Sequence, residues 1–320
     1  MIIMKLKVSI GICARNCESF IKETINSIAA QDYPHNLMEL IFVDDGSEDK
    51  TLEIVQNCLS QIDISSKVFH TPWKGLGHAR NIVVTHAKGK YILWIDGDMI
   101  ISKNYVSRLI DFMEKNPRIG IAKGKQALKI GSSLLATLEA YSRAAGRMLD
   151  YLSPKARYKS LGTGGAIYRK EIFEKIGKFD ENLKGYGEDS DIEIRAKNAG
   201  FLLTTVNVNF SDFERHGLTW KNLWEKYWLR GYYGYYFFHK HKSLLKHYRM
   251  IPPAAFLAGI YASFKLYRLT GLKAVFLIPF LNIFKTTAWY IGFLTRELKK
   301  VSVSKQSRIR DIHLCKKLFI

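Results

Sequence analysis

The chain has 320 residues, enough for one large domain with an appendage or for two domains, and 47% of them are hydrophobic, enough for a sizeable core. The formal net charge of +20 predicts an anionic partner, which would be nucleic acid, an acidic membrane surface or a phosphorylated substrate. The four cysteines lack the spacing of metal ligands, which favours free thiols in a reducing compartment.

The first 124 residues alternate between strand and helix patterns. Apolar runs predict strands at 8–13, 39–43, 67–69 and 91–95. Apolar residues at helical spacing lie between and after these runs, at 20–28, 52–59, 77–87 and 109–113. This alternation predicts an α/β fold with a mostly parallel sheet covered by helices on both faces. The chain begins with a strand pattern and lacks the pattern of a signal peptide, so we expect this part to stay in the cytoplasm.

The pattern between residues 131 and 215 is less regular. The expected elements, in chain order, are a helix and a basic loop over 131–160, a glycine-rich turn at 161–166, a loop at 179–189, a helix over 190–199 closed by Gly200, and a strand over 202–208.

The composition changes after residue 215. Tryptophan, tyrosine and phenylalanine crowd residues 220–238, and a basic run follows at 239–249. Aromatic side chains of this kind concentrate at membrane–water interfaces, and the alternative is an aromatic core helix under the sheet. The interleaved lysines and arginines favour the membrane interface.

Two apolar stretches, 251–264 and 272–294, come before a basic tail. Only the second is long enough to cross a bilayer, and Lys273, Asn282 and Lys285 make a crossing costly. The basic tail should stay on the cytoplasmic side, which requires an even number of crossings or none. A hairpin or helices lying in the membrane plane fit better than one complete span.

Two carboxylates come together at Asp96-Gly97-Asp98, where the apolar run 91–95 ends. Charges are almost never left unpaired at the end of a buried strand, and Mg²⁺ or Mn²⁺ is the natural partner for such oxygen ligands. A tight turn followed by a helix cap is the competing interpretation.

Four further segments carry polar residues suited to nucleotide chemistry. They are 12–16 after the first strand, Asp44-Asp45-Gly46-Ser47 after the second, the glycine turn and Arg80 within 75–81, and Glu188-Asp189 at a helix start. Acids after a second strand also occur in dinucleotide-binding folds, but those need a Gly-x-Gly-x-x-Gly after the first strand, and only Gly11 is present there. For Glu188-Asp189 the alternative is a favourable interaction with the helix N-terminus.

As an ordered set these motifs resemble the family-2 glycosyltransferases with the GT-A fold. The resemblance covers about residues 6–215 and rests on 8–16, 43–47, 77–81, 96–98, 162–169 and 177–191. It implies a Rossmann-like sheet flanked by helices, a nucleotide-sugar donor and a divalent cation, Mg²⁺ or Mn²⁺.

The resemblance also implies a role for individual residues. Asp189 would be the catalytic base, and Asp98 would touch the metal, with His216 a second residue near the metal or the diphosphate. The nucleotide sugar would be bound by Asn16, Asp44, Asp45, Arg80, Asn81, Asp96 and Glu188. Of these, Asp44 would read the base, Asp96 would meet the ribose or a metal-bound water, and Arg80 would face the diphosphate.

The sequence departs from the family pattern in two places. The Gln-x-x-Arg-Trp motif of processive synthases is absent, since 215–220 does not match it, and this argues against processive polymer synthesis. The usual proline and tyrosine of the first motif are replaced by Cys13 and Arg15, which changes the base-stacking contact.

We therefore expect a membrane-associated, metal-dependent, inverting glycosyltransferase, with its catalytic domain on the cytoplasmic side. It would use a UDP- or GDP-sugar and a lipid-linked or cell-surface glycan acceptor at an anionic membrane surface. The alternatives are a polyprenyl-phosphate sugar synthase, a nucleic-acid-binding protein suggested only by charge, and an inactive membrane scaffold. The expected parts are a GT-A domain over 1–215, an interfacial segment over 216–250, membrane-associated helices over 251–295 and a basic tail over 296–320.

Overall fold

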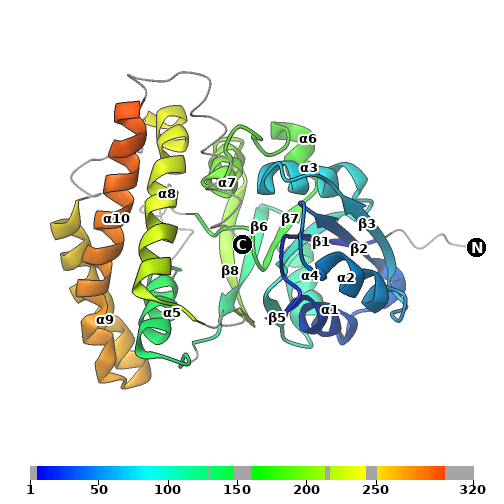
Figure 1. Ribbon diagram of the computed structural model, residues 1–320. Helices are drawn as coiled ribbons and strands as arrows, with labels where there is room; N and C mark the ends of the chain where they lie inside the picture. Colours follow the sequence, from blue (N-terminus) through cyan, green and yellow to red (C-terminus); the bar gives the residue numbers. More distant parts are fainter. Residues whose placement is uncertain (1–5, 129, 148–159, 213–216, 243–250, 300–320) are drawn as a thin grey trace, which may run out of the picture. The chain divides into compact units, whose positions relative to one another are not determined.

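A sheet of eight strands and a separate group of long helices make up the computed structural model (Figure 1). The structure describes residues 6–128, 130–147, 160–212, 217–242 and 251–299. The chain divides into two units. The sheet unit comprises residues 1–127, 150–184 and 188–213, and the helical unit comprises 128–149, 185–187 and 214–320.

The sheet has the strand order β3-β2-β1-β4-β7-β6-β8-β5. Its strands are β1 (Val8–Ala14), β2 (Met38–Asp44), β3 (Ser65–His70), β4 (Tyr91–Asp96), β5 (Met99–Ile101), β6 (Ile119–Gln126), β7 (Ala166–Arg169) and β8 (Leu202–Asp212). The four strands from β3 to β4 are parallel. Beyond β4 the directions are mixed. β7 is antiparallel to both β4 and β6, β8 is parallel to β6, and β5 is antiparallel to β8.

The prediction of a mostly parallel sheet therefore needs correction beyond β4, where the sheet is mixed. All four strands predicted within the first 124 residues are present, as β1, β2, β3 and β4. The strands that pattern reading missed are β5, β6 and β7. Two of these are only three and four residues long, too short for alternation to show.

Helices cover both faces of the sheet (Figure 1). One core cluster joins one face of the sheet to α1 (Ile21–Ala29), α2 (Thr51–Leu59) and α4 (Tyr105–Lys115). A second cluster joins the other face to α3 (Leu76–His86), α6 (Glu171–Ile176) and α7 (Glu188–Asn198). Every residue of β2 is buried, because helices cover both faces of the sheet at this strand.

The helical unit contains five elements. They are α5 (Leu134–Arg147), α8 (Trp220–Lys240), α9 (Pro252–Thr270), the short 3₁₀ helix η5 (Lys273–Leu277) and α10 (Ile278–Lys299). Its apolar core gathers side chains from all five. Within the described residues, the single stretch long and apolar enough to cross a membrane is Lys273–Lys299, which is weak evidence for a membrane and is consistent with the apolar stretch expected there.

Candidate functional site

The carboxyl ends of β2, β1 and β4 lie side by side at one edge of the sheet. β1 is paired in parallel with both neighbours, and the register sets Ala14 opposite Asp44 and Cys13 opposite Asp96. The loops that follow these strands, with the polar residues singled out from the sequence, therefore share this edge. In open α/β sheets this is where ligands bind.

Asp44 is fully buried at the end of β2, and its carboxylate is already held by neighbours. It accepts hydrogen bonds from the Ser47 backbone N–H, 3.2 Å from Oδ1, and from the Ser47 hydroxyl. Its Oδ2 lies 2.6 Å from Nδ1 of His70, a half-exposed residue that ends β3. Sequence reasoning missed His70, although its position next to the acidic end of β2 follows from the strand order.

Asn16 joins the loop after β1 to the loop after β2. It has a left-handed backbone with a φ of 50°, and its N–H donates to the Ser47 hydroxyl across 3.0 Å. Its side-chain Oδ1 accepts from the Glu48 N–H at 2.8 Å. Arg15 reinforces the junction by donating from Nε to the Gly46 carbonyl at 3.0 Å. The two loops are thus preorganised as one polar rim.

Asp45 connects the same rim to the start of α3. Its two carboxylate oxygens accept the backbone N–H groups of Lys74 and Gly75 at 2.9 and 3.0 Å. Burial raises the pKa of Asp45 above its ordinary value, and these two hydrogen bonds oppose that rise. Gly75 has a φ of 99°, a backbone conformation that side chains disfavour, and it lets the chain turn into α3 at this point.

Asp96 and Asp98 lie at the turn from β4 to β5. Burial, followed by the charge of Asp98, raises the pKa of Asp96. The negative charge of Asp212 in β8 also raises the pKa of Asp96, and the positive charges of Arg80 and Lys123 lower it. Three acids and two bases thus surround one strand end, and the acids are in excess.

Arg80 and Glu188 form a buried ion pair between α3 and the first turn of α7. Nη1 of Arg80 donates to Oε1 of Glu188 across 2.6 Å, and the guanidinium lies 5.7 Å from the centre of the Phe179 ring. Burial lowers the pKa of Arg80, but Glu188, Asp96 and Asp189 outweigh it and hold that pKa above its ordinary value. Burial and the adjacent Asp189 raise the pKa of Glu188, and Arg80 opposes them. The edge of the sheet and the start of α7 therefore belong to one electrostatic cluster.

A family model described as Glycosyl transferase family 2 matches residues 9–177, more than half of the chain. The chain belongs to glycosyl transferase family 2. It is therefore a glycosyltransferase, and the resemblance drawn from its motifs is confirmed. The match runs from β1 through α6, so Glu188 and Asp189 lie beyond the segment that the family model covers.

Two bacterial relatives illustrate the similarity. The poly(ribitol-phosphate) beta-N-acetylglucosaminyltransferase TarS of Staphylococcus aureus is 32% identical over 204 residues, 62% of this chain and 36% of TarS. The probable glycosyltransferase YdaM of Bacillus subtilis is 28% identical over 236 residues, 70% of this chain and 55% of YdaM. The chain thus spans about a third to about half of the length of these relatives.

Solved structures share the fold. The crystal structure of TarS residues 1–349 aligns with a TM-score of 0.53 and 19% identity, covering 91% of each chain. The mannosyltransferase PcManGT from Pyrobaculum calidifontis, in complex with GDP-Man and Mn²⁺, aligns with a TM-score of 0.59 and 18% identity, covering 94% of this chain and 88% of that one. The α/β fold is therefore that of GT-A glycosyltransferases.

The donor atoms around Asp96 fit a divalent cation of the kind present in the PcManGT complex. Gly164, in the glycine turn before β7, lies against this carboxylate, and a Cβ there would collide with Oδ2 of Asp96. The absence of a side chain at Gly164 thus lets the Asp96 carboxylate lie directly against this turn. Mg²⁺ and Mn²⁺ need only one or two protein carboxylates when substrate phosphates complete their shell, and Asp96 and Asp98 are two such carboxylates. Among the described residues, no three acidic, histidine or cysteine side chains are placed to hold a metal ion together.

Sequence reasoning missed a clamp on the glycine turn, formed by Lys123 of β6 and Glu193 of α7. Nζ of Lys123 donates to the carbonyls of Leu161 and Gly162 at 2.8 and 3.2 Å, and Oε2 of Glu193 accepts the Leu161 N–H at 2.7 Å. Both side chains are buried. The two side chains hold the two peptide groups that flank Leu161, immediately before the turn that reaches Asp96.

The clamp adjoins the predicted base. Oδ2 of Asp189 lies 3.4 Å from the position that a Cβ on Gly162 would take. Burial, followed by the charge of Asp189, raises the pKa of Glu193 to about 7. A lysine in a buried strand was the available indication, because a buried charge requires a partner.

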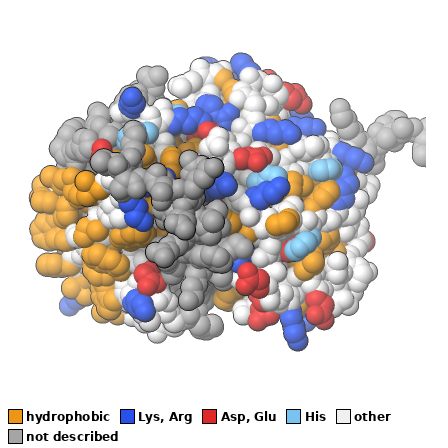
Figure 2. All heavy atoms as spheres, turned by 45° about the horizontal axis from the view of Figure 1, so that its top comes forward, with side chains coloured by type: hydrophobic (Ala, Val, Ile, Leu, Met, Phe, Trp, Pro, Cys, Tyr) orange, Lys and Arg blue, Asp and Glu red, His pale blue; other side chains and the backbone are white. Residues whose placement is uncertain are grey.

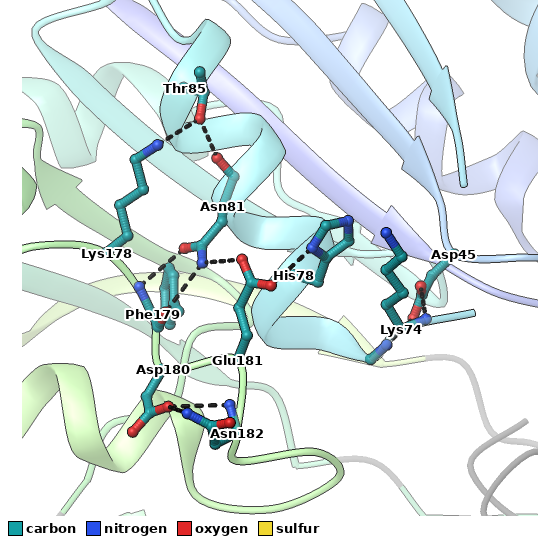
Figure 3. A network of polar contacts seen from close by, with 11 residues as sticks. Asp45, Lys74, His78, Asn81, Thr85, Lys178, Phe179, Asp180, Glu181 and Asn182 are labelled. Atoms are coloured by element: carbon teal, nitrogen blue, oxygen red, sulfur yellow. Dashed lines mark hydrogen bonds and ion pairs between the residues drawn. The ribbon is translucent and has the colours of Figure 1, made fainter. Parts of the chain in front are cut away.

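Asn81 has a different position from the other predicted ligands. Its amide donates to the Phe179 carbonyl and to the Glu181 carboxylate, and its Oδ1 accepts the Phe179 N–H, all at 2.8–3.0 Å (Figure 3). His78 lies 2.9 Å from the same Glu181 carboxylate. These contacts attach the segment before α7 to α3, so Asn81 positions that segment in this structure.

The structure brings together Asp96, Arg80, Glu188 and Asp189, with Asp98 beside Asp96. Asp44, Asp45 and Asn16 form the adjoining rim. His216, predicted near the metal or diphosphate, lies outside the described residues.

Proposed function

We propose that this family 2 enzyme transfers a sugar from a UDP- or GDP-sugar to a glycan or polyprenyl-linked acceptor, with inversion and with Mg²⁺ or Mn²⁺. The observation that carries the proposal is the cluster at the sheet edge. Asp96, Asp98 and the Arg80–Glu188 pair converge there with Asp189. An excess of acids at a strand end suits a cation and a diphosphate arriving together.

The nucleoside would lie along the rim formed by Asn16, Asp44 and Asp45. Asp44 offers a carboxylate fixed in place by Ser47 and His70, which suits recognition of a base edge. UDP-GlcNAc in the TarS complex and GDP-Man in the PcManGT complex support a nucleotide sugar as the donor class. Cys13 would contact the nucleotide where relatives carry proline. Burial, opposed by Arg80, raises the pKa of its thiol to about 12 and keeps it neutral.

The departing nucleoside diphosphate would carry negative charge, and Arg80 would stabilise it from a fixed, buried position. A divalent cation bound at Asp98 would supply the remaining neutralisation. Asp189 would take the proton of the acceptor hydroxyl as that oxygen attacks the anomeric carbon. One base and a direct displacement give inversion. Glu188 is paired with Arg80, so it is less suited to that proton transfer.

The acceptor would be a lipid-linked or cell-surface glycan precursor. The name of TarS, a poly(ribitol-phosphate) beta-N-acetylglucosaminyltransferase, supports a polymeric acceptor. The helical unit carries a shallow surface depression lined by Trp220, Lys221, Trp224, Glu225 and Phe284, where an acceptor would meet apolar side chains. Exposed apolar side chains on α9 and α10 support association with a membrane, and the net charge of +20 favours an anionic one. We propose that the sheet unit lies on its cytoplasmic side.

A polyprenyl-phosphate sugar synthase is the second candidate, favoured by the same exposed apolar side chains. Its acceptor is a phosphate that is already ionised, so a strong general base matters less. The two candidates therefore differ in their dependence on Asp189.

A donor screen tests the proposal. Purified full-length protein is given a panel of UDP- and GDP-sugars with Mn²⁺ or Mg²⁺, and release of nucleoside diphosphate is measured. We expect one donor class to be hydrolysed slowly alone and rapidly with a lipid-linked acceptor. Full activity in the presence of a chelator would contradict metal dependence, and retention of the anomeric configuration in the product would contradict inversion.

A further inference from the structure

The helices α8, α9 and α10 pack closely at several small residues, and α9 and α10 leave many of their large apolar residues exposed. Gly231 of α8 and Gly292 of α10 lie so close to the opposite helix that a Cβ on either would collide with a backbone carbonyl, of Trp289 and Trp228 respectively. Ser263 of α9 is fully buried. Close packing through small residues is typical of helices in lipid, where burying large apolar side chains between helices gains nothing.

One exposed face follows α9, η5 and α10, and we call it the apolar face. Its large exposed side chains are Leu257, Ile260, Tyr261, Phe264, Phe276, Leu277, Phe280, Ile291, Leu294 and Leu298. On an ideal helix, Leu257, Tyr261 and Phe264 fall within about 60° of one another, as do Phe280, Ile291, Leu294 and Leu298. Hydrophobic side chains gather over these helices in Figure 2. Large apolar side chains exposed together in this way mark a contact with a partner or a membrane.

A buried ion pair lies away from this face, in the middle of the candidate span. Nζ of Lys285 in α10 donates to Oε2 of Glu139 in α5 at 2.9 Å and to the Ser142 hydroxyl at 2.7 Å. The Tyr227 hydroxyl of α8 donates to Oε1 of Glu139 at 3.0 Å. Lys285 and Glu139 are both buried, so α10 is attached to its neighbours through polar groups.

The position of Lys285 argues against a crossing. Lys273–Lys299 has 27 residues, and Lys285 is near its midpoint, so a spanning helix would carry the lysine to the bilayer centre. Glu139 of α5, which is paired with Lys285, would go with it, and charged side chains are costly at the bilayer centre. Lys285 is instead about 140° around α10 from Phe280, which allows the apolar face to meet lipid while the ion pair stays away from it.

The geometry points to an in-plane membrane helix pair. We propose that α9, η5 and α10 enter one leaflet with the apolar face and that Lys273–Lys299 does not cross the bilayer. Exposed Lys265, Arg268 and Lys273 adjoin this face and would meet anionic lipid headgroups. The net charge of +20 favours the same partner. The inference rests on the proposed membrane association and is independent of the proposed chemistry.

Vesicle flotation tests the lipid contact. Full-length protein is mixed with phosphatidylcholine vesicles, with or without phosphatidylglycerol, and the floated fraction is measured. We expect flotation with the anionic vesicles, reduced about tenfold or more by the triple variant Leu257→Gln/Phe264→Gln/Phe280→Gln. Ile130→Gln, at an exposed apolar residue of the helical unit that belongs to none of α9, η5 and α10, should float like the unmodified chain.

Donor turnover in detergent is measured in parallel and should be unchanged in the triple variant, so that a failed docking surface is distinguishable from a failed glycosyltransferase. If the unmodified chain does not float and the triple variant converts a dimer to a monomer in analytical ultracentrifugation, the face is an interface between copies and the proposal is overturned.

Cysteine labelling distinguishes docking from spanning. Lys273→Cys and Glu297→Cys are introduced separately into a chain whose native cysteines are replaced by alanine, and sealed vesicles of both orientations are treated with a membrane-impermeant maleimide. In-plane helices predict that both positions react in the same vesicle orientation. Reaction of the two positions in opposite orientations would show a crossing and overturn the proposal.

Discussion

Arg80 donates to Glu188 across 2.6 Å, and both side chains are buried where α3 meets the first turn of α7. The two residues are 108 positions apart in the chain, so the ion pair fixes the segment that carries Asp189 relative to the strand ends that carry Asp96. A charge that is buried with its partner becomes costly once the partner is removed.

Removal of one partner should therefore destabilise the protein more than removal of both. Arg80→Met is expected to lower the free energy of unfolding by about 3–5 kcal/mol, and Arg80→Met/Glu188→Met should recover much of that loss. Neither variant should release nucleoside diphosphate at the native rate. Urea unfolding measures the first effect, with Lys115→Ala as the control, because the exposed Lys115–Asp111 pair should contribute less than about 1 kcal/mol. An equally small effect for Arg80→Met would contradict the buried pair.

Asp98→Ala should abolish sugar transfer and weaken binding of the nucleoside diphosphate, because the two phosphates would lose their cation. Calorimetric titration of UDP and GDP, with and without Mn²⁺, measures the binding. Asp111→Ala removes an exposed carboxylate of α4 and serves as the control. Metal-independent binding that is the same in both variants would exclude a metal role for Asp98.

Asp189→Asn keeps the shape of the side chain and removes its basicity. Turnover should fall by roughly two to four orders of magnitude, while donor affinity changes little. Steady-state rates and donor titration separate the two effects. Equal loss of both would make Asp189 a donor ligand or a structural residue, and an unchanged rate would favour a phosphate acceptor.

Glu193 should make the stability depend on pH. Burial and the charge of Asp189 raise its pKa from 4.5 to about 7, so the folded state binds this proton more tightly than the unfolded state. Its contribution to stability is complete below about pH 4.5 and is lost as the pH rises through about 7. Lys123, Tyr168 and Lys197 also face this carboxyl.

Glu193→Gln is neutral at every pH, so its stability relative to the native chain should rise between pH 5 and pH 8, measured by urea unfolding. Glu181→Gln is a control of opposite sign. Hydrogen bonds from Asn81 and His78 lower the pKa of Glu181, so its contribution is present at neutral pH and is lost in acid. The same pH dependence in both variants would rule out this assignment.

Asn81→Leu should lower the free energy of unfolding by about 1–3 kcal/mol, because the backbone N–H and carbonyl of Phe179 would lose their hydrogen-bond partner. Since Asn81 holds the segment before α7 (Figure 3), we expect a lower turnover with little change in donor affinity. A large loss of donor affinity with normal stability would restore Asn81 to the donor ligands.

The strands that carry the rim were predictable because each is a continuous apolar run ending in polar residues. β2 contains such a run from Leu40 to Val43, and the register of parallel strands then brings Asp44 and Asp96 to one edge. The mixed half of the sheet was not predictable in this way. Lys123 interrupts the apolar pattern of β6. The carbonyl of Leu161, which accepts a hydrogen bond from its ammonium group, comes from a turn 38 residues further along the chain.

Glu193 illustrates the same limit on a helix. It stands four residues after Asp189, and an acidic pair at this spacing looks like a solvated helix face. Its burial becomes evident only when the Leu161 N–H is seen to donate to it. Similarly, the roles of Asn81 and Arg80 depend on partners about 100 positions away. The local sequence pattern therefore identified the acidic residues. Tertiary contacts determined which of them are already bound to other groups of the protein.

Gly164 offers a way to obstruct the site mechanically. Because any Cβ at this position would collide with Oδ2 of Asp96, a single methyl group takes up room beside the carboxylate without deleting a charge. Gly164→Ala should therefore displace the Asp96 carboxylate while every charge is kept, and we expect weaker donor binding. Comparison with the acidic substitutions would then separate the position of this carboxylate from its charge.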